Sequence, residues 1–391
     1  MIPYGHQSIG DGDIKAVTDV LTSGWLTQGP AVPRFEDALC HATQATHAVA
    51  VTNATSALHL ACLALGLGPG DVGWTVPNTF VASANCILYC GATVDFVDID
   101  PATRNMSVAA LEEKLKKAEK NGALPRVLIP VHFGGHSCDM AAIGALARTY
   151  GFRIIEDASH AIGGHYGNRP VGACEYSDIA VLSFHPVKIV TTGEGGAALT
   201  RDAALAARMR LLRSHGIARE TQCRPARDAG AWYYEQQALG FNFRMTDMQA
   251  ALGASQMTRL AAFVSAREAL AARYDAALAS LPVRLPPRAP HIRSAWHLYT
   301  VEIDGEPGGV ADSHGARRAR VFEHMRTAGI GVNVHYIPVH WQPWYRDLGF
   351  RRGDFPMAEH YYRRALTLPL FPGLSHDDQD RVIEALAGAL K

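Results

Sequence analysis

Short apolar runs alternate with helical patterns from about residue 30 to residue 200, and this alternation limits the folds open to the chain. The apolar runs have the length of strands and cover residues 71–76, 93–99, 127–133, 153–156, 179–184 and 197–200. The helical patterns between them cover residues 55–65, 80–89, 108–120 and 140–150. Strands that alternate with helices form a mostly parallel sheet covered on both faces. The sequence therefore predicts an α/β fold.

The last third of the chain is organised differently. A helical pattern at residues 246–281 is followed by four prolines, which predict a stiff connector near residues 282–290. Beyond the connector the patterns predict one strand and two helices, at residues 299–303, 317–328 and 376–390. We therefore expect two domains, a large α/β domain of residues 1–260 and a smaller C-terminal α+β domain of residues 261–391.

The composition argues against several classes of function. The chain has 391 residues with 37 Lys+Arg and 37 Asp+Glu, so its formal net charge is zero. A protein that binds nucleic acid needs a basic face, which this balance does not favour. A low net charge leaves association unopposed, which favours a homo-oligomer. No apolar run approaches the length of a membrane span and no signal-peptide pattern opens the sequence, so we expect a cytoplasmic protein.

Cysteine and histidine pairs raise the question of a metal site. Cys86 and Cys90 lie four residues apart in an apolar helical pattern, where buried cysteines are most often small apolar side chains. His132 and His136 straddle two glycines, so helical ligand spacing does not apply to them. No carboxylate or cysteine cluster joins them, and no metal site is predicted.

Lys188 follows the apolar strand at residues 179–184 and precedes a glycine-rich turn. A lysine near the interior must reach water, find a partner or lose its proton. A lysine that loses its proton easily is a nucleophile that bonds to carbonyl groups. In a parallel sheet, ligands bind beyond the carboxyl ends of the strands. Asp157, Ser183 and Lys188 lie at or just past such ends, so we expect them to meet at one site.

Lys188 and Asp157 match two needs of the cofactor pyridoxal phosphate. This cofactor requires an amine for its aldehyde, a charged partner for its ring nitrogen, a phosphate site and groups that hold its ring. Lys188 supplies the amine, and a carboxylate at Asp157 can keep the ring nitrogen protonated. Taken alone, Asp157 is more often a helix cap or an ion-pair partner, and Lys188 a surface lysine.

Thr55, Ser56, Phe80, His160 and Ser183 can supply the phosphate site and the ring contacts that the cofactor also requires. Thr55 and Ser56 begin a helix, whose free N–H groups, dipole and two hydroxyls form a phosphate site. Ser183 adds a hydroxyl near the lysine, and His160 and Phe80 can hold the two faces of the ring. Taken alone, His160 and Phe80 are more often core residues. The set, found in this order within one α/β domain, favours a cofactor site.

Four segments carry a resemblance to a known family, at residues 53–58, 77–80, 156–163 and 183–188. With them the chain resembles, over nearly its whole length, the DegT/DnrJ/EryC1/StrS family of nucleotide-sugar aminotransferases. The resemblance implies a fold-type-I transferase, similar to aspartate aminotransferase, that carries pyridoxal phosphate on Lys188 and works by a ping-pong mechanism. Family members that dehydrate sugars have a histidine at the lysine position, so Lys188 argues against that branch. His160 stands where many members have glutamine, and unlike glutamine it can titrate.

Residues 240–247 also match the family. The asparagine of this segment reaches, in the family, from the partner subunit to the cofactor phosphate. For this chain the resemblance implies that Asn242 completes the site of a partner subunit, and that the protein is an obligate homodimer.

Segments at residues 2–5, 25–30, 83–86, 89–92 and 332–340 resemble one branch of the family, the C4 aminotransferases of the pseudaminic acid pathway. This implies transfer of an amino group from L-glutamate to C4 of a UDP-2-acetamido-2,6-dideoxy-4-ketohexose. The alternatives are another nucleotide 4-ketosugar, linked to GDP, dTDP or UDP, and a non-catalytic regulator on the same fold. A nicotinamide dehydrogenase is disfavoured because no G-x-G-x-x-G follows the first strand.

Polar groups near the predicted cleft are candidates for substrate contacts. Arg244, His335 and Tyr336 lie on segments that can overhang the cleft, and His185 is close to the lysine. His335 can equally be an ordinary strand histidine, and His185 a packing residue before a proline. Residues 216–240 form a long polar and aromatic segment with little periodicity, which predicts a functional loop.

Overall fold

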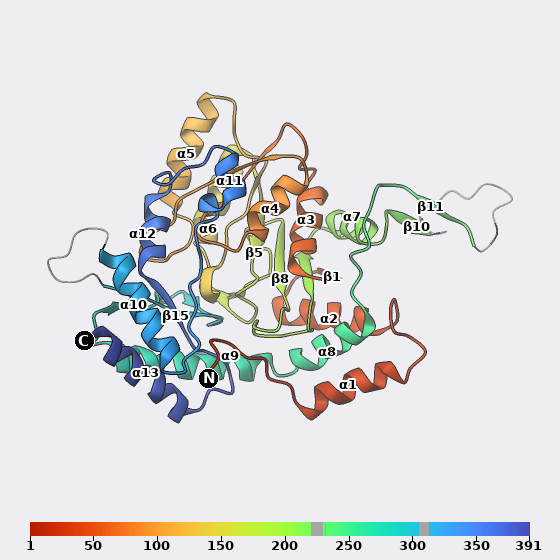
Figure 1. Ribbon diagram of the computed structural model, residues 1–391. Coiled ribbons are helices and arrows are strands. Elements are labelled where there is room, and N and C mark those ends of the chain that lie inside the picture. The colour runs from red at the N-terminus through yellow and green to blue at the C-terminus, as the bar shows by residue number, and fades with distance from the viewer. Residues whose placement is uncertain (220–229, 231, 305–312) are drawn as a thin grey trace.

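The computed structural model describes residues 1–219, 230, 232–304 and 313–391. Its centre is a seven-stranded sheet (Figure 1). The strands lie side by side in the order β1 (His47–Val51), β9 (Gly196–Thr200), β8 (Ile179–Ser183), β5 (Arg153–Asp157), β4 (Val127–Leu128), β2 (Val72–Thr75) and β3 (Thr93–Phe96). All neighbours from β8 to β3 are parallel, whereas β9 is antiparallel to both β1 and β8. The predicted α/β fold with a mostly parallel sheet is confirmed.

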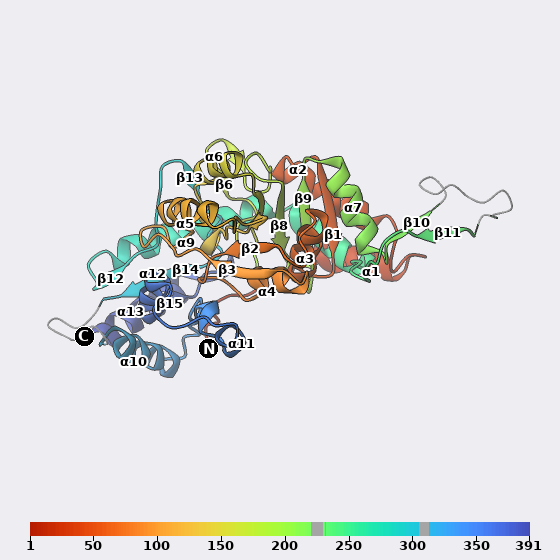
Figure 2. The same ribbon diagram turned by 90° about the horizontal axis from the view of Figure 1, so that it is seen from above.

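Helices cover both faces of this sheet (Figure 2). One face carries α3 (Ala54–Ala64), α4 (Ala82–Tyr89) and α7 (Ala203–Arg213), and the other carries α2 (Ala31–Thr43), α5 (Val108–Lys120) and α6 (Met140–Tyr150). Alternate residues of a strand point to opposite faces. On β8, Ile179 and Val181 pack in one core, while Ala180 and Leu182 pack in the other. The strand is buried on both sides, which explains its unbroken apolar run.

The strand predicted at residues 127–133 is wrong in its second half. The regular strand β4 ends at Leu128, and residues Phe133–Gly135 form a 3₁₀ turn. Pro130 lies in between and has no backbone N–H to donate to a neighbouring strand, so the ladder cannot continue regularly.

The single helix predicted at residues 246–281 is also wrong, because the segment forms two helices, α8 (Asp247–Met257) and α9 (Leu260–Leu278). The break lies where three side chains converge on the buried Asp13 of α1 (Asp11–Leu21). Ser255 and Gln256 donate hydrogen bonds to its carboxylate at 2.6 and 2.7 Å, and Arg259 forms an ion pair with it. A contact across some 240 residues leaves no trace in local sequence pattern.

A smaller core surrounds a second sheet of β12 (Val283–Arg284), β14 (Tyr299–Ile303) and β15 (Ala365–Leu368). Helices α10 (Ser313–Thr327), α12 (Pro356–Arg364) and α13 (His376–Leu390) lie beside this sheet. Helix α9 joins the two parts, since Phe263 packs in the large core and Leu270 and Tyr274 pack in the smaller one. β12 lies in the proline-rich connector. The division into domains at residue 260 stays a prediction.

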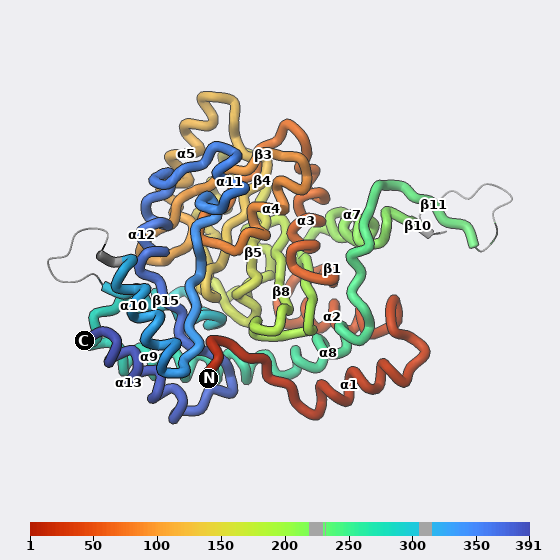
Figure 3. The backbone as a smooth tube through the Cα atoms, viewed as in Figure 1, coloured from red at the N-terminus to blue at the C-terminus, as the bar shows by residue number. Residues whose placement is uncertain are grey.

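The N-terminal segment runs along the C-terminal part of the chain (Figure 3). Ile2 forms a parallel bridge with Ile330, and the backbone N–H of Gly331 donates to the carbonyl of Ile2. The N–H of Leu370 donates to the carbonyl of Tyr4 at 3.0 Å. These contacts hold the first residues of the chain against residues 330–331 and 370, and the ring centroid of Tyr4 lies 5.6 Å from that of His335.

A hairpin of β10 (Ile217–Arg219) and β11 (Tyr234–Gln236) projects from the body (Figures 1 and 2). The functional loop predicted at residues 216–240 falls partly outside the described residues. Three short strands, β13 (Ile292–Arg293), β6 (His165–Tyr166) and β7 (Arg169–Pro170), form a small sheet. The remaining elements are helix α11 (Pro343–Asp347) and the 3₁₀ turn Val339–Trp341. Across the described ranges, no helix combines the length and apolarity that a membrane span requires.

Candidate functional site

A cleft of about 960 Å³ opens at the carboxyl ends of β5 and β8. Asp157 is the last residue of β5 and Ser183 the last of β8, and the two strands are parallel neighbours. Lys188 follows in a turn, where its backbone N–H donates to the carbonyl of His185 at 2.8 Å. The predicted site residues that line this cleft are Thr55, Ser56, Phe80, Asp157, His160, Ser183, His185, Lys188, His335 and Tyr336.

The surroundings of Lys188 make its amine easier to deprotonate. Its side chain is partly buried, and burial lowers the pKa of Lys188 from 10.5 to about 8, against the opposing effect of the Asp157 charge. An amine with this pKa is partly neutral near physiological pH, so it can serve as a nucleophile or a base without a large cost.

Both carboxylate oxygens of the buried Asp157 accept hydrogen bonds. The hydroxyl of Ser83 donates to Oδ2 at 2.6 Å, and the backbone N–H of Ser159 donates to Oδ1 at 3.1 Å. The hydroxyl of Thr79 lies 2.8 Å from that of Ser83 and extends the network. These donors fix the orientation of the carboxylate in the wall of the cleft. The sequence singled out Ser83 only as part of a resembling segment and predicted no role for it at the site, because a serine within a helical pattern does not specify such a contact.

The first turn of α3 forms another wall. Asn53 caps the helix, and its side chain accepts a hydrogen bond from the backbone N–H of Ser56 at 2.8 Å. The N–H groups of Ala54 and Thr55 have no acceptor within the helix, so this turn suits an anion. Gly196 of β9 lies against the turn, and a Cβ at that position would approach the Ala54 nitrogen to 2.5 Å. Only glycine permits this close packing.

The buried His160 is held by two hydrogen bonds. The backbone N–H of Gly134 donates to Nδ1 at 3.2 Å, so the proton of the neutral ring is on Nε2, which donates to the Tyr336 hydroxyl at 3.2 Å. Burial, followed by the Lys188 charge, lowers the pKa of His160 well below 6.5, so this histidine stays neutral near physiological pH. The rings of His160 and Tyr336 are nearly parallel, and the ring centroid of the exposed Phe80 lies 6.4 Å from that of Tyr336.

Two further histidines are buried beside the lysine. Nδ1 of His335 lies 2.7 Å from the hydroxyl of Thr367, and burial, with a smaller effect of Lys188, lowers the pKa of His335 to about 3. Nε2 of His297 lies 3.5 Å from Nζ of Lys188, and its ring centroid is 4.4 Å from that of His160. His297 was missed by sequence reasoning, since it lies 109 positions from Lys188 in an irregular segment before β14.

Asn242 and Arg244 lie outside the cleft of their own chain. Asn242 is exposed and bridges Ser214 through the backbone, while Arg244 is half-buried and bridges Val51. The contact predicted for Asn242 with a partner subunit stays a prediction, and the structure does not bring Arg244 into the cleft as a substrate contact. His185 lines the cleft with an exposed side chain, which does not fit the alternative of a packing residue.

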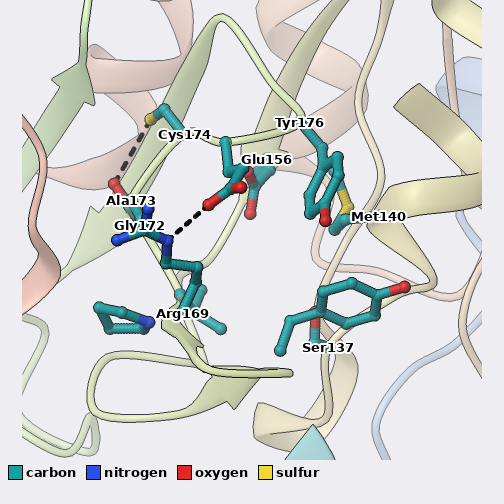
Figure 4. A pocket seen from close by; sticks show the side chains of 12 residues that line it. Ser137, Met140, Glu156, Arg169, Gly172, Ala173, Cys174 and Tyr176 are labelled. Carbon is teal, nitrogen blue, oxygen red and sulfur yellow. Dashed lines mark hydrogen bonds and ion pairs between the residues drawn. The ribbon is translucent and has the colours of Figure 1, made fainter. Parts of the chain in front are cut away.

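A second cavity, beside Glu156 and Arg169, is far smaller (Figure 4). Its volume of about 20 Å³ has room for about one water molecule. Arg169 pairs with Glu175 at 2.7 Å, and Glu156 accepts hydrogen bonds from Ser177 and from His132, the latter at 2.8 Å. The charged groups here have partners within the protein. A further cavity of about 760 Å³, beside Asp95 and Lys114, is lined by none of the predicted site residues, so the cleft at Lys188 is the candidate site for a substrate. In the described part of the chain, no three His, Cys, Asp or Glu side chains gather as they would around a metal ion.

Comparison with known proteins identifies the relatives of the chain. Residues 7–387 match the DegT/DnrJ/EryC1/StrS aminotransferase family. The chain is 41% identical over 393 residues to the spore coat polysaccharide biosynthesis protein SpsC of Bacillus subtilis, covering 100% of this chain and 97% of SpsC.

Solved structures agree with this assignment. PseC of Helicobacter pylori, an aminotransferase involved in the biosynthesis of pseudoaminic acid, is 29% identical with a TM-score of 0.89 and covers 100% of this chain and 99% of its own. Spr1654 of Streptococcus pneumoniae is 28% identical to this chain. Its PMP form has a TM-score of 0.89 and covers 100% of this chain and 99% of its own. Its PLP form has a TM-score of 0.88 and covers 99% of this chain and 98% of its own.

The groups of the cleft fit the cofactor that these relatives carry. The lysine amine with its lowered pKa, the oriented carboxylate of Asp157 and the helix terminus packed on Gly196 match the aldehyde, ring nitrogen and phosphate of pyridoxal phosphate. The cofactor is therefore pyridoxal phosphate. The protein is a sugar aminotransferase with the fold-type-I architecture, and the chain belongs to the DegT/DnrJ/EryC1/StrS aminotransferase family.

Proposed function

We propose that this enzyme transfers the amino group of L-glutamate to C4 of a UDP-2-acetamido-2,6-dideoxy-4-ketohexose, the reaction of the pseudaminic acid pathway. The observation that carries the proposal is the position of Tyr4, His335 and Tyr336, which line the cleft beside Lys188. These residues belong to the two segments, 2–5 and 332–340, on which the resemblance to that branch depends. The similarity over the whole chain to Helicobacter pylori PseC, an aminotransferase involved in the biosynthesis of pseudoaminic acid, supports this pathway. A cytoplasmic location is part of the proposal.

Lys188 is the proposed proton carrier of both half-reactions. Pyridoxal phosphate supplies, when bound, an aldehyde that bonds to amines and a ring that accepts electrons. Nζ of Lys188 removes the α-proton of glutamate as a base and, in the second half-reaction, delivers a proton to C4 of the sugar as an acid. Asp157 keeps the ring nitrogen protonated. Since 2-oxoglutarate leaves before the sugar is aminated, the kinetics are expected to be ping-pong.

The other residues of the cleft are proposed to bind and orient. The hydroxyls of Thr55, Ser56 and Ser183 bind the phosphate together with the first turn of α3, whose dipole favours an anion. His160, neutral and fixed by Gly134, covers one face of the cofactor ring. The exposed Phe80 covers the other face, where it also shields the reacting atoms from water.

A different nucleotide 4-ketosugar, linked to GDP, dTDP or UDP, is the second candidate. It is favoured by the higher identity to SpsC, a spore coat polysaccharide biosynthesis protein, which is 41% against 29% for PseC. Both candidates use the same amino transfer and differ in the sugar and the nucleotide.

A panel of nucleotide 4-ketosugars distinguishes these candidates. With L-glutamate as donor, the UDP-linked 2-acetamido sugar is expected to give a product in which the keto oxygen is replaced by an amino group, detected by mass spectrometry. GDP- and dTDP-linked 4-ketosugars are expected to stay unchanged, because their nucleotides and C2 substituents differ. The Lys188→Ala variant is the matched control and should aminate none of them. Amination of a GDP- or dTDP-sugar alone would contradict the proposed substrate.

We also propose that the enzyme is a homodimer in which Asn242 completes the cleft of the partner. Asn242 is exposed and does not line the cleft of its own chain. Large apolar side chains are exposed on and after α1, such as Ile14 and Trp25, and on the projecting hairpin, such as Tyr234. Where large apolar side chains gather on an exposed surface, they usually mark an interface with another protein.

Mixing two inactive variants tests the shared site. Lys188→Ala and Asn242→Ala are each expected to be strongly impaired, because every cleft lacks either its own lysine or the partner's asparagine. Subunits mixed in equal amounts under exchange conditions should recover about a quarter of wild-type activity, since half of the dimers are mixed and each restores one of its two clefts. Activity that stays at the level of the separate variants would show that Asn242 does not act across a dimer.

A further inference from the structure

His297 is buried in the wall of the cleft, and each of its ring nitrogens has an unusual position. Nε2 lies 3.5 Å from Nζ of Lys188, at the outer limit of a hydrogen bond. Nδ1 is also buried, and it has no hydrogen-bond partner among the described residues. An unpaired buried polar atom is costly, so it requires an explanation.

The backbone of His297 is fixed from two sides. Nη1 of the buried Arg267 donates to the carbonyls of Trp296, His297 and Leu370 at 3.2, 3.3 and 2.8 Å. On the other side Gly135 packs so closely that a Cβ there would lie 3.1 Å from the His297 nitrogen. The backbone that carries the ring is therefore fixed beside the lysine.

We infer that His297 is a positioning residue for Lys188, holding its ammonium group between proton transfers. An ammonium can only donate, so the contact requires the lone pair of Nε2 and places the ring proton on Nδ1. The lysine side chain has four rotatable bonds, and an acceptor beside Nζ restricts their freedom. Nδ1–H is left to bind a water molecule or an acceptor atom of a ligand. This inference rests on the proposed role of Lys188.

The charges around His297 and Lys188 determine in which direction loss of His297 should shift the pKa of Lys188. Burial, then the charge of Lys188, lowers the pKa of His297 well below 6.5, so the ring stays neutral and acts only through its hydrogen bond. That bond favours the charged lysine, as does Asp157, while burial disfavours it. Loss of the acceptor should therefore lower the pKa of Lys188. The other titratable or charged groups around the pair are His160, His335 and Arg267.

Trace acetylation of the full-length, cofactor-free protein measures this pKa directly. The acetylated fraction of the Lys188 peptide is followed by mass spectrometry between pH 6 and 11, and in the wild type it should titrate near pH 8. In His297→Leu the midpoint should fall by about one pH unit, the usual worth of one hydrogen bond to a charged group. In His297→Gln, whose side-chain oxygen replaces Nε2 as acceptor, the midpoint should return to the wild-type value.

His136→Leu is the matched control. His136 is likewise buried, and its Nε2 also lacks a partner among the described residues, but it does not line the cleft. Its substitution should leave the midpoint of Lys188 unchanged. Equal midpoints in the wild type and His297→Leu, or the same shift in the Leu and Gln variants, would overturn the inference. The labelling needs neither cofactor nor sugar, so its outcome does not depend on the proposed reaction. Failure of the proposed reaction would instead be seen as an unchanged UDP-sugar in the substrate panel, or as activity of the Lys188→Ala variant.

Discussion

Lys188→Ala is expected to slow the glutamate half-reaction by about a thousandfold or more, because it removes both the covalent anchor of the cofactor and the proton carrier. The rate is measured by stopped-flow absorbance of the bound cofactor after addition of L-glutamate. A second readout is retention of the cofactor through gel filtration, which should fall when no amine is present to bond to the aldehyde.

The loss can be separated from misfolding. Burial lowers the pKa of Lys188 from 10.5 to about 8, so the charged lysine costs folding free energy. That cost is fully present below about pH 8 and disappears above pH 10.5. Removing the side chain should therefore not lower the melting temperature of the cofactor-free protein at pH 7. Lys114→Ala is the matched control, since Lys114 is also a partly buried lysine with a lowered pKa but does not line the cleft. Turnover of glutamate by Lys188→Ala at the wild-type rate would refute the proposed role.

Part of the cleft could be predicted from sequence because it depends on where parallel strands end. Asp157 and Ser183 close two apolar runs, and Lys188 follows the second run in the next turn. Parallel strands place such ends at one edge of a sheet, whatever the order of the strands between them. The same argument does not reach His335 or Tyr336, whose place beside the lysine follows from a segment near the C-terminus that only resemblance singled out.

The missed contacts share a physical cause. Ser83 donates to a carboxylate 74 positions away, and His297 contacts a lysine 109 positions away. Neither side chain lies in a pattern that specifies its partner, because the contact is set by how helices and loops pack on the sheet. The break between α8 and α9, fixed by Asp13 far upstream, follows the same rule. Local pattern reports elements and their ends, whereas the choice of tertiary partner depends on the assembled fold.

Asp157→Asn is expected to keep the cofactor but lower kcat by about a hundredfold to a thousandfold, because a neutral amide cannot hold the ring nitrogen in its charged form. The fold should tolerate the change. The amide oxygen still accepts from the N–H of Ser159, and the hydroxyl of Ser83 can rotate to accept from the amide nitrogen while it donates to Thr79. The cofactor absorbance band and the melting temperature should therefore remain close to those of the wild type while steady-state turnover falls.

Asp178→Asn provides the matched comparison, since Asp178 lies beside the opposite ends of the same two strands. It accepts a hydrogen bond from the N–H of Ile154 and pairs with Arg153, outside the cleft. Its substitution is expected to leave kcat near the wild-type value, whatever small loss of stability follows from the weakened ion pair. If Asp157→Asn retained full activity, the charge at the end of β5 would not be acting on the cofactor ring, and the oriented carboxylate with its two donors would be a structural feature of the sheet edge alone.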